Sequence, residues 1–121
     1  MVQTFGFGDK VLFLGYRENI SELMSVMDCF VLPSRFEGFA FVGVEAQAAG
    51  LPTFFSTEIS SELKLTNLAY YMSLNDGPKF WADKILQVKD KSRENVGFKL
   101  IDAGYDIRSE ICKMLTFYLS K

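Results

Sequence analysis

Two glutamates, Glu37 and Glu45, are separated by seven residues and flank the start of a predicted helix. A carboxylate has two acceptor oxygens, so each glutamate can bind both hydroxyls of a sugar cis-diol. The backbone N–H groups at the helix start attract phosphate, because they lack partners inside the helix and lie at the positive end of its dipole. These groups belong to Gly38, Phe39, Ala40 and Phe41. The pattern suits a nucleotide sugar, which has a sugar at each end and a diphosphate between.

The residue types alone also allow a simpler interpretation. A glycine such as Gly38 lets a ligand approach the backbone closely, but a glycine in a strand-to-helix loop is ordinary. Glu37 would then be a solvated loop residue, and Glu45 a favourable charge near a helix N-terminus. Without further information, the residues favour this simpler interpretation.

Short apolar runs alternate with helical patterns and predict the elements that position these residues. Runs apolar on both faces are typical of buried parallel strands. Strands are predicted at residues 11–14, 29–32, 53–56 and 68–74. Their alternation with helices predicts one α/β domain over residues 1–121, with a Rossmann-like parallel sheet flanked by helices. The carboxyl ends of such strands are where ligands bind.

Helix boundaries are marked by capping residues. Asn19 and Glu22 form a capping-box pattern before a helix that ends near Asp28. A second helix is predicted at residues 42–49, where Gly50 stops it and a proline follows. Three later helices are predicted, beginning at Pro78, Ser92 and Asp106.

Composition excludes several classes of function. The 121 residues carry 13 basic and 15 acidic side chains, a net charge of -2 that indicates neither nucleic acid nor an anionic membrane as a partner. Histidine is absent, which excludes Ser-His and Cys-His catalysis and His-ligated metals within this chain. Cys29 and Cys112 are far apart and are predicted to stay reduced. With no apolar stretch long enough for a membrane span, we expect a cytoplasmic protein.

Residues 11–62 closely resemble the C-terminal, nucleotide-sugar-binding domain of retaining GT-B glycosyltransferases of the family 4 type. The matching segments are VLFLGY (11–16), DCFVLPS (28–34), EGF (37–39) and VEAQAAGLP (44–52). The tail is similar around residues 81–86 and 105–107, so the resemblance begins at about Phe5 and covers nearly the whole chain. The spacing from Glu37 to Glu45 matches the E-x7-E motif of that family.

The resemblance implies a role for each residue of the motif. Glu37, the catalytic candidate, would face the donor sugar near the reacting carbon, and Glu45 would hold the ribose hydroxyls. Tyr16 and Arg17 would line the nucleotide pocket, with a surface pair as the alternative. The backbone from Gly38 to Phe41 would contact the diphosphate. The donor would be a UDP- or GDP-sugar, with no metal and no other cofactor, in the synthesis of a capsule or another surface polysaccharide.

The resemblance also predicts what this chain lacks. Relatives hold the acceptor on an N-terminal domain and neutralise the diphosphate with an Arg/Lys pair, and neither feature has a counterpart here. We therefore expect a truncated, inactive glycosyltransferase whose full-length form is cytoplasmic or membrane-peripheral. We also expect self-association, as a homodimer or domain swap, through an open sheet edge.

Two other functions remain as alternatives. The first is a non-catalytic nucleotide-sugar-binding or interaction module with the same fold. The second is a phospho-receiver or flavodoxin-like domain. The strand ends oppose the second alternative, because they carry Tyr16-Arg17 and Ser34-Arg35 rather than clustered acidic residues or a hydroxyl-rich phosphate loop.

Overall fold

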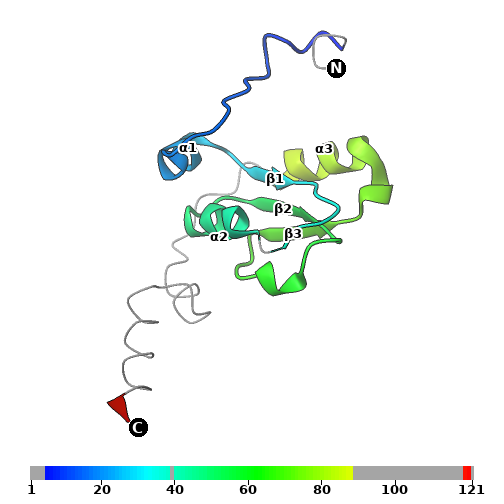
Figure 1. Ribbon diagram of the computed structural model, residues 1–121. Helices are drawn as coiled ribbons and strands as arrows, with labels where there is room; N and C mark the ends of the chain where they lie inside the picture. The colour runs from blue at the N-terminus through cyan, green and yellow to red at the C-terminus, as the bar shows by residue number, and fades with distance from the viewer. Residues whose placement is uncertain (1–4, 39, 89–118, 121) are drawn as a thin grey trace.

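A three-stranded parallel sheet lies at the centre of the protein (Figure 1). The structure is a computed structural model that describes residues 5–38, 40–88 and 119–120. Its elements are α1 (Ile20–Val26), β1 (Phe30–Leu32), α2 (Phe41–Ala48), β2 (Thr53–Ser56), the 3-10 helix η1 (Ser61–Leu63), β3 (Ala69–Met72), the 3-10 helix η2 (Leu74–Asp76) and α3 (Gly77–Val88). This α/β arrangement of a parallel sheet with helices confirms the predicted Rossmann-like fold class.

The strands pair in chain order, β1-β2-β3, and every pair is parallel. Phe30 is aligned with Thr53, and Thr53 with Ala69. Because all three strands run the same way, their carboxyl ends lie at one edge of the sheet. The loop that carries Glu37 leaves this edge after β1 and leads into α2.

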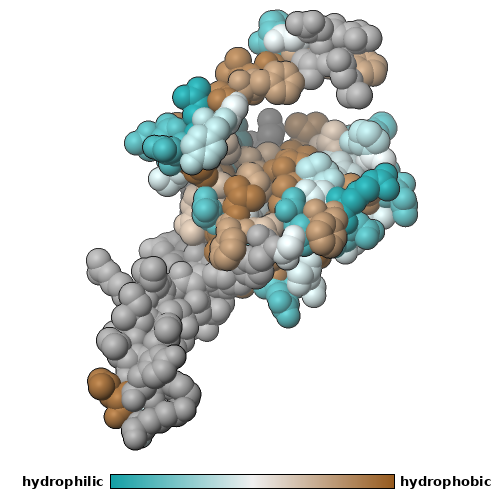
Figure 2. Space-filling model, viewed as in Figure 1, coloured by the Kyte–Doolittle hydropathy of each residue, from teal (hydrophilic) through white to brown (hydrophobic). Residues whose placement is uncertain are grey.

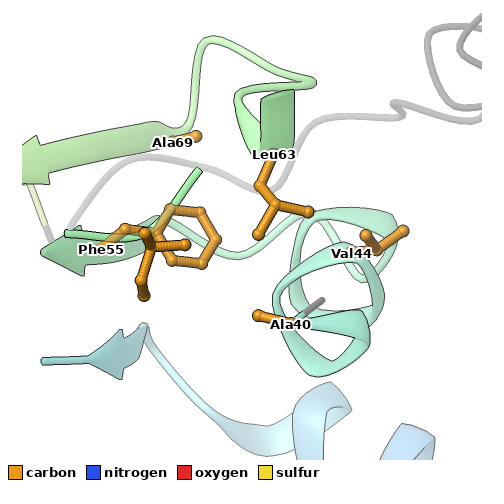
Figure 3. Packing of buried hydrophobic residues seen from close by; sticks show 6 residues of the cluster. Ala40, Val44, Phe55, Leu63 and Ala69 are labelled. Carbon is orange, nitrogen blue, oxygen red and sulfur yellow. The ribbon is translucent and has the colours of Figure 1, made fainter. Parts of the chain in front are cut away.

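The two faces of the sheet are covered by different helices. Neighbouring residues on a strand point to opposite faces. Phe55 packs with Val44 of α2 in a cluster that also contains Leu63 (Figure 3). Phe54, on the other face, packs with Trp81 of α3. Both phenylalanines are fully buried, so β2 forms the centre of the core.

Helix α1 packs against α2 through a third apolar cluster. The buried residues of this cluster are Met24 of α1, Ala46 of α2 and Leu51, which follows α2. Met24 is the only residue of α1 that is buried. The contact fixes the side of α1 that carries Ile20 and Met24 beside α2, whereas Glu22 and Val26 are exposed.

Gly50 ends α2 where the sequence predicted. Its φ of 74° lies in the left-handed region that glycine tolerates best. The N–H of Gly50 donates to the carbonyl of Gln47 at 2.9 Å, and the N–H of Leu51 donates to the carbonyl of Ala46 at 3.1 Å. These two bonds form a Schellman motif, which satisfies carbonyls at the helix end.

Two local predictions are wrong. Residues 11–14 form no strand, and Leu12 and Phe13 are 82% and 85% exposed. A strand is held by hydrogen bonds to a neighbour, and no described strand lies beside this segment. Asn19 does not cap α1 through a backbone N–H. Its side-chain amide instead donates to the carboxylate of Glu22 at 3.3 Å, so the capping box does not form.

The other boundaries agree with prediction to within one or two residues. The helices expected from Ser92 and Asp106, and Cys112, lie outside the described residues. Cys29 is a free thiol whose pKa is raised above its ordinary value of 9.0, first by burial and then by the negative charge of Asp28. In residues 5–38 and 40–88, no helix combines the length and the hydropathy that crossing a bilayer requires.

Candidate active site

The loop after β1 carries Glu37 at the carboxyl edge of the sheet. Glu37 is exposed, and the hydroxyl of Ser34 donates to its Oε1 at 2.7 Å. The carbonyl of Ser34 accepts a hydrogen bond from the hydroxyl of Ser56, the last residue of β2. The loop is therefore joined at Ser34 both to the buried sheet and to the candidate catalytic carboxylate.

The start of α2 is open on the side of Gly38. A Cβ placed on Gly38 would meet no atom within 4 Å, so space remains beside this backbone. Ala40 is the N-cap of α2, and its methyl side chain makes no capping hydrogen bond. The Ala40 side chain packs into the core, whereas Phe41 is 65% exposed. Phe39 lies outside the described residues.

Glu45 lies on the exposed side of α2, facing α1. It lines a pocket of about 670 Å³ whose wall is completed by α1 and the residues before it. The lining residues are Glu18, Ile20, Ser21, Met24, Ser25, Glu45, Ala48 and Ala49. Small-molecule sites commonly have this size, an apolar wall and a few polar groups. A ribose held by the Glu45 carboxylate would have room here.

Tyr16 and Arg17 lie on the segment that leads to α1. Tyr16 is 89% exposed, and Arg17 Nε donates to the carbonyl of Leu14 at 3.1 Å. Neither residue lines the pocket that contains Glu45. The structure therefore does not bring this pair to the pocket, and their predicted nucleotide contact has no support from it.

Several residues at the site were assigned no role from the sequence. Glu18 and Ser21 line the pocket with Glu45, and Ser34 contacts Glu37. The spacing of Ser34 and Glu37, three residues apart, is a signal that favours a local side-chain contact. Glu18 and Ser21 gave no such signal, because the packing of α1 against α2 places them there.

The lining of the pocket beside Glu45 includes neither Glu37 nor the start of α2, so the structure does not gather the two glutamates around one cavity. Both glutamates offer acceptor oxygens, and the start of α2, which lies between them in the sequence, is a helix N-terminus of the kind that favours phosphate. No group of three or more metal-ligating side chains gathers among the described residues. With its pKa raised, the Cys29 thiol stays protonated at neutral pH and is a poor nucleophile.

A family model of group 1 glycosyl transferases matches residues 1–91, about three quarters of the chain. The chain belongs to this family. The matched residues include all three strands and both glutamates of the site. The predicted family is therefore confirmed, and the chain is a transferase by family.

Curated relatives agree with the family. A putative glycosyltransferase EpsF of Bacillus subtilis is 38% identical over 89% of this chain and 29% of its own length. A UDP-Gal:alpha-D-GlcNAc-diphosphoundecaprenol alpha-1,3-galactosyltransferase of Escherichia coli is 29% identical over 91% of this chain and 30% of its own length. The lipopolysaccharide core biosynthesis mannosyltransferase LpsB of Rhizobium meliloti is 43% identical over 42% of this chain and 14% of its own length.

The chain thus spans less than a third of the length of these relatives. No solved structure matches it significantly. The roles assigned to individual residues of the site therefore stay predictions.

Proposed function

We propose that this chain is the donor-binding part of a glycosyltransferase that takes a sugar from a nucleotide-diphosphate sugar. The observation that carries the proposal is the position of Glu45. It lies on the helix that begins just after the Glu37 loop, and it lines a pocket of about 670 Å³ beside α1. Family membership makes the ribose end of a nucleotide sugar the natural occupant of that pocket, whose lining includes neither Glu37 nor the start of α2.

Each part of the donor has a proposed contact. The carboxylate of Glu45 accepts hydrogen bonds from the ribose hydroxyls, and that of Glu37 faces the transferred sugar. Between them, the start of α2 from Gly38 to Phe41 receives the diphosphate. Negative charge grows on the diphosphate as the sugar leaves, and oriented backbone N–H groups stabilise such charge. We propose that no metal takes part.

The names of the relatives support a choice of donor and acceptor. One relative is named for UDP-Gal as donor and for a saccharide on diphosphoundecaprenol as acceptor, and another for lipopolysaccharide core biosynthesis. We propose a UDP- or GDP-sugar as donor, a saccharide or lipid-linked acceptor, and a role in surface polysaccharide synthesis. A cytoplasmic or membrane-peripheral location fits this role.

We expect the 121 residues alone to bind the donor weakly and to transfer no sugar. They correspond to less than a third of the relatives' length, and the resemblance places the acceptor and the diphosphate-neutralising cations on other parts of a GT-B enzyme. Catalysis of group transfer depends on such preorganised charge. Binding, rather than turnover, is therefore the property to measure.

Replacing Glu45 by alanine should weaken binding of UDP or GDP by roughly tenfold or more, because hydrogen bonds to a charged group contribute about 1.5–3 kcal/mol. Titration calorimetry on the parent and on Glu45→Ala measures this change. Asp83→Ala is the matched control, since it removes one exposed negative charge from α3.

The control variant should bind as the parent does. Equal affinity of the parent and Glu45→Ala would show that Glu45 does not hold the ribose. Failure of the parent to bind UDP, GDP or their sugars at millimolar concentrations would contradict the proposed function as a whole.

A further inference from the structure

Ser34 joins the exposed candidate carboxylate to the buried sheet. On one side, its hydroxyl donates to Glu37 Oε1 at 2.7 Å. On the other, its backbone carbonyl accepts from the hydroxyl of Ser56. Ser34 thus links the Glu37 carboxylate, which is on an exposed loop, to Ser56, which is in the buried sheet.

The buried end of this link is rigid. Ser56 has no exposed surface, and its strand β2 is the central strand, paired with both β1 and β3. Buried central strands are among the parts of a fold that open least. Ser34, two residues beyond β1, is therefore held at the carboxyl edge of the sheet by a contact other than the strand pairing itself.

The exposed end of the link needs such support. A glutamate side chain loses about 1.5–2 kcal/mol of rotamer freedom when it is ordered. Glu37 lies on an exposed loop, where the bond from Ser34 is the one side-chain hydrogen bond that it makes among the described residues. That bond fixes Oε1 and leaves Oε2 available for a ligand. An ordered carboxylate binds sugar hydroxyls more tightly, because part of the ordering has occurred before the ligand arrives.

We infer that Ser34 is a positioning residue, which orients the Glu37 carboxylate toward the donor sugar while Ser56 holds Ser34 in place. The inference rests on the proposed function, because it requires a donor sugar next to Glu37. A positioning role differs from a purely structural role in one respect. Loss of the Ser34 hydroxyl should lower the affinity for the nucleotide sugar but leave the affinity for the nucleoside diphosphate unchanged.

The experiment compares the affinity of each variant for a nucleoside diphosphate and for the matching nucleotide sugar. Calorimetry on the full chain would use UDP with UDP-galactose and UDP-N-acetylglucosamine, and GDP with GDP-mannose. We expect Ser34→Ala to weaken the best-bound nucleotide sugar by roughly three- to tenfold, which is less than the loss of a direct contact would cost, because the Ser34 hydroxyl acts on the sugar only through Glu37. Its affinity for the corresponding nucleoside diphosphate should be unchanged.

Two further variants separate positioning from folding. Ser34→Thr keeps a hydroxyl at the same position and should restore most of the affinity for the nucleotide sugar. Ser61→Ala removes an exposed serine hydroxyl elsewhere and should have no effect on either ligand. Thermal unfolding followed by circular dichroism checks that each variant is folded.

The possible outcomes distinguish failure of the positioning role from failure of the proposed function on which it rests. If the parent binds both ligands and Ser34→Ala binds both as the parent does, the positioning role is wrong and the proposed function stands. Equal weakening of both ligands would likewise overturn positioning, because it indicates a general change in the site. If the parent binds none of these ligands, the proposed function fails and the inference fails with it.

Discussion

Close contact between one glycine and one aromatic ring sets how α2 lies on the sheet. A Cβ placed on Gly43 would be 2.6 Å from both Cε1 and Cζ of Phe55. Phe55 is fully buried at the centre of the core, so its ring has little room to move. The absence of a side chain at Gly43 therefore lets α2 approach β2 closely, and this approach positions Glu45 two residues further along the helix.

The Gly43→Ala variant should be less stable than the parent by about 1–3 kcal/mol, the usual cost of overpacking a core. The direction is informative, because alanine in place of glycine ordinarily stabilises a helix interior by about 0.5–1 kcal/mol. Urea unfolding followed by circular dichroism measures the difference. Adding Phe55→Leu to Gly43→Ala should cost less than the two separate changes together, since a shorter side chain gives the new methyl group space.

At the same scale, the residues of the site divide into those that the sequence indicated and those that it did not. Glu37 and Glu45 were identified because their types and spacing match a known motif. Glu18 and Ser21 belong to another part of the chain, and only the packing of α1 places them beside Glu45. No local pattern encodes such a contact.

Among the elements, the loop between η1 and β3 is attached to α2 by one buried side chain. Gln47 has no exposed surface, and both the nitrogen and the oxygen of its side-chain amide have hydrogen-bond partners. Its Nε2 donates to the carbonyls of Gly43 at 3.2 Å and Leu63 at 2.7 Å. Its Oε1 accepts from the N–H groups of Leu65 and Thr66, both at 3.1 Å, and from the Thr66 hydroxyl.

Replacing Gln47 by leucine should destabilise the protein by about 3 kcal/mol or more. Leucine has a similar volume, but it leaves several buried backbone groups without a partner, and each such group costs about 1–3 kcal/mol. Urea unfolding measures the loss. Gln87→Leu, on an exposed position of α3, is the control and should change stability by less than about 0.5 kcal/mol. A loss below 1 kcal/mol in Gln47→Leu would contradict this anchoring role.

Element prediction succeeded where an element's own residues contain the decisive signal. The left-handed turn at Gly50 ended α2 as expected, because a glycine is needed there whatever surrounds it. The segment at 11–14 has an equally clear strand pattern but no strand. A strand requires a neighbour, and its own sequence cannot supply one.

At the scale of the whole molecule, several apolar side chains of the described residues are exposed to solvent. Val31 of β1 is 37% exposed and lines a second pocket of about 400 Å³ with Trp81 and Ile85 of α3. β1 pairs only with β2 among the described strands, so its other edge is unpaired. The exposed side chains of Leu12 and Phe13 add to the apolar surface on the segment that precedes α1 (Figure 2). Unpaired strand edges and apolar patches of this kind favour association.

We expect the 121-residue chain to form dimers or larger species at tens of micromolar and above. Size-exclusion chromatography with light scattering over a range of concentrations measures this association. Val31→Lys should shift the equilibrium toward monomer, because a charge on an edge strand opposes pairing with another chain. Val26→Lys, which introduces the same charge at an 80% exposed position on α1, should change the association little. A parent that is monomeric at all concentrations would exclude an associating edge.

The sequence by itself determined the family, the α/β class and the three strands that pair, and it identified the spacing of the two glutamates, whose roles stay predictions. Each of these depends on apolar periodicity, on turn-forming glycine or proline, or on a motif within a short stretch of chain. Tertiary structure alone decided that α1 completes a pocket with Glu45, that Gly43 lies against Phe55, that Gln47 anchors the loop before β3, and that residues 11–14 form no strand. The physical reason is that these features depend on contacts between residues far apart in the chain or on the presence of a neighbouring strand. The residues of a short segment cannot specify either one.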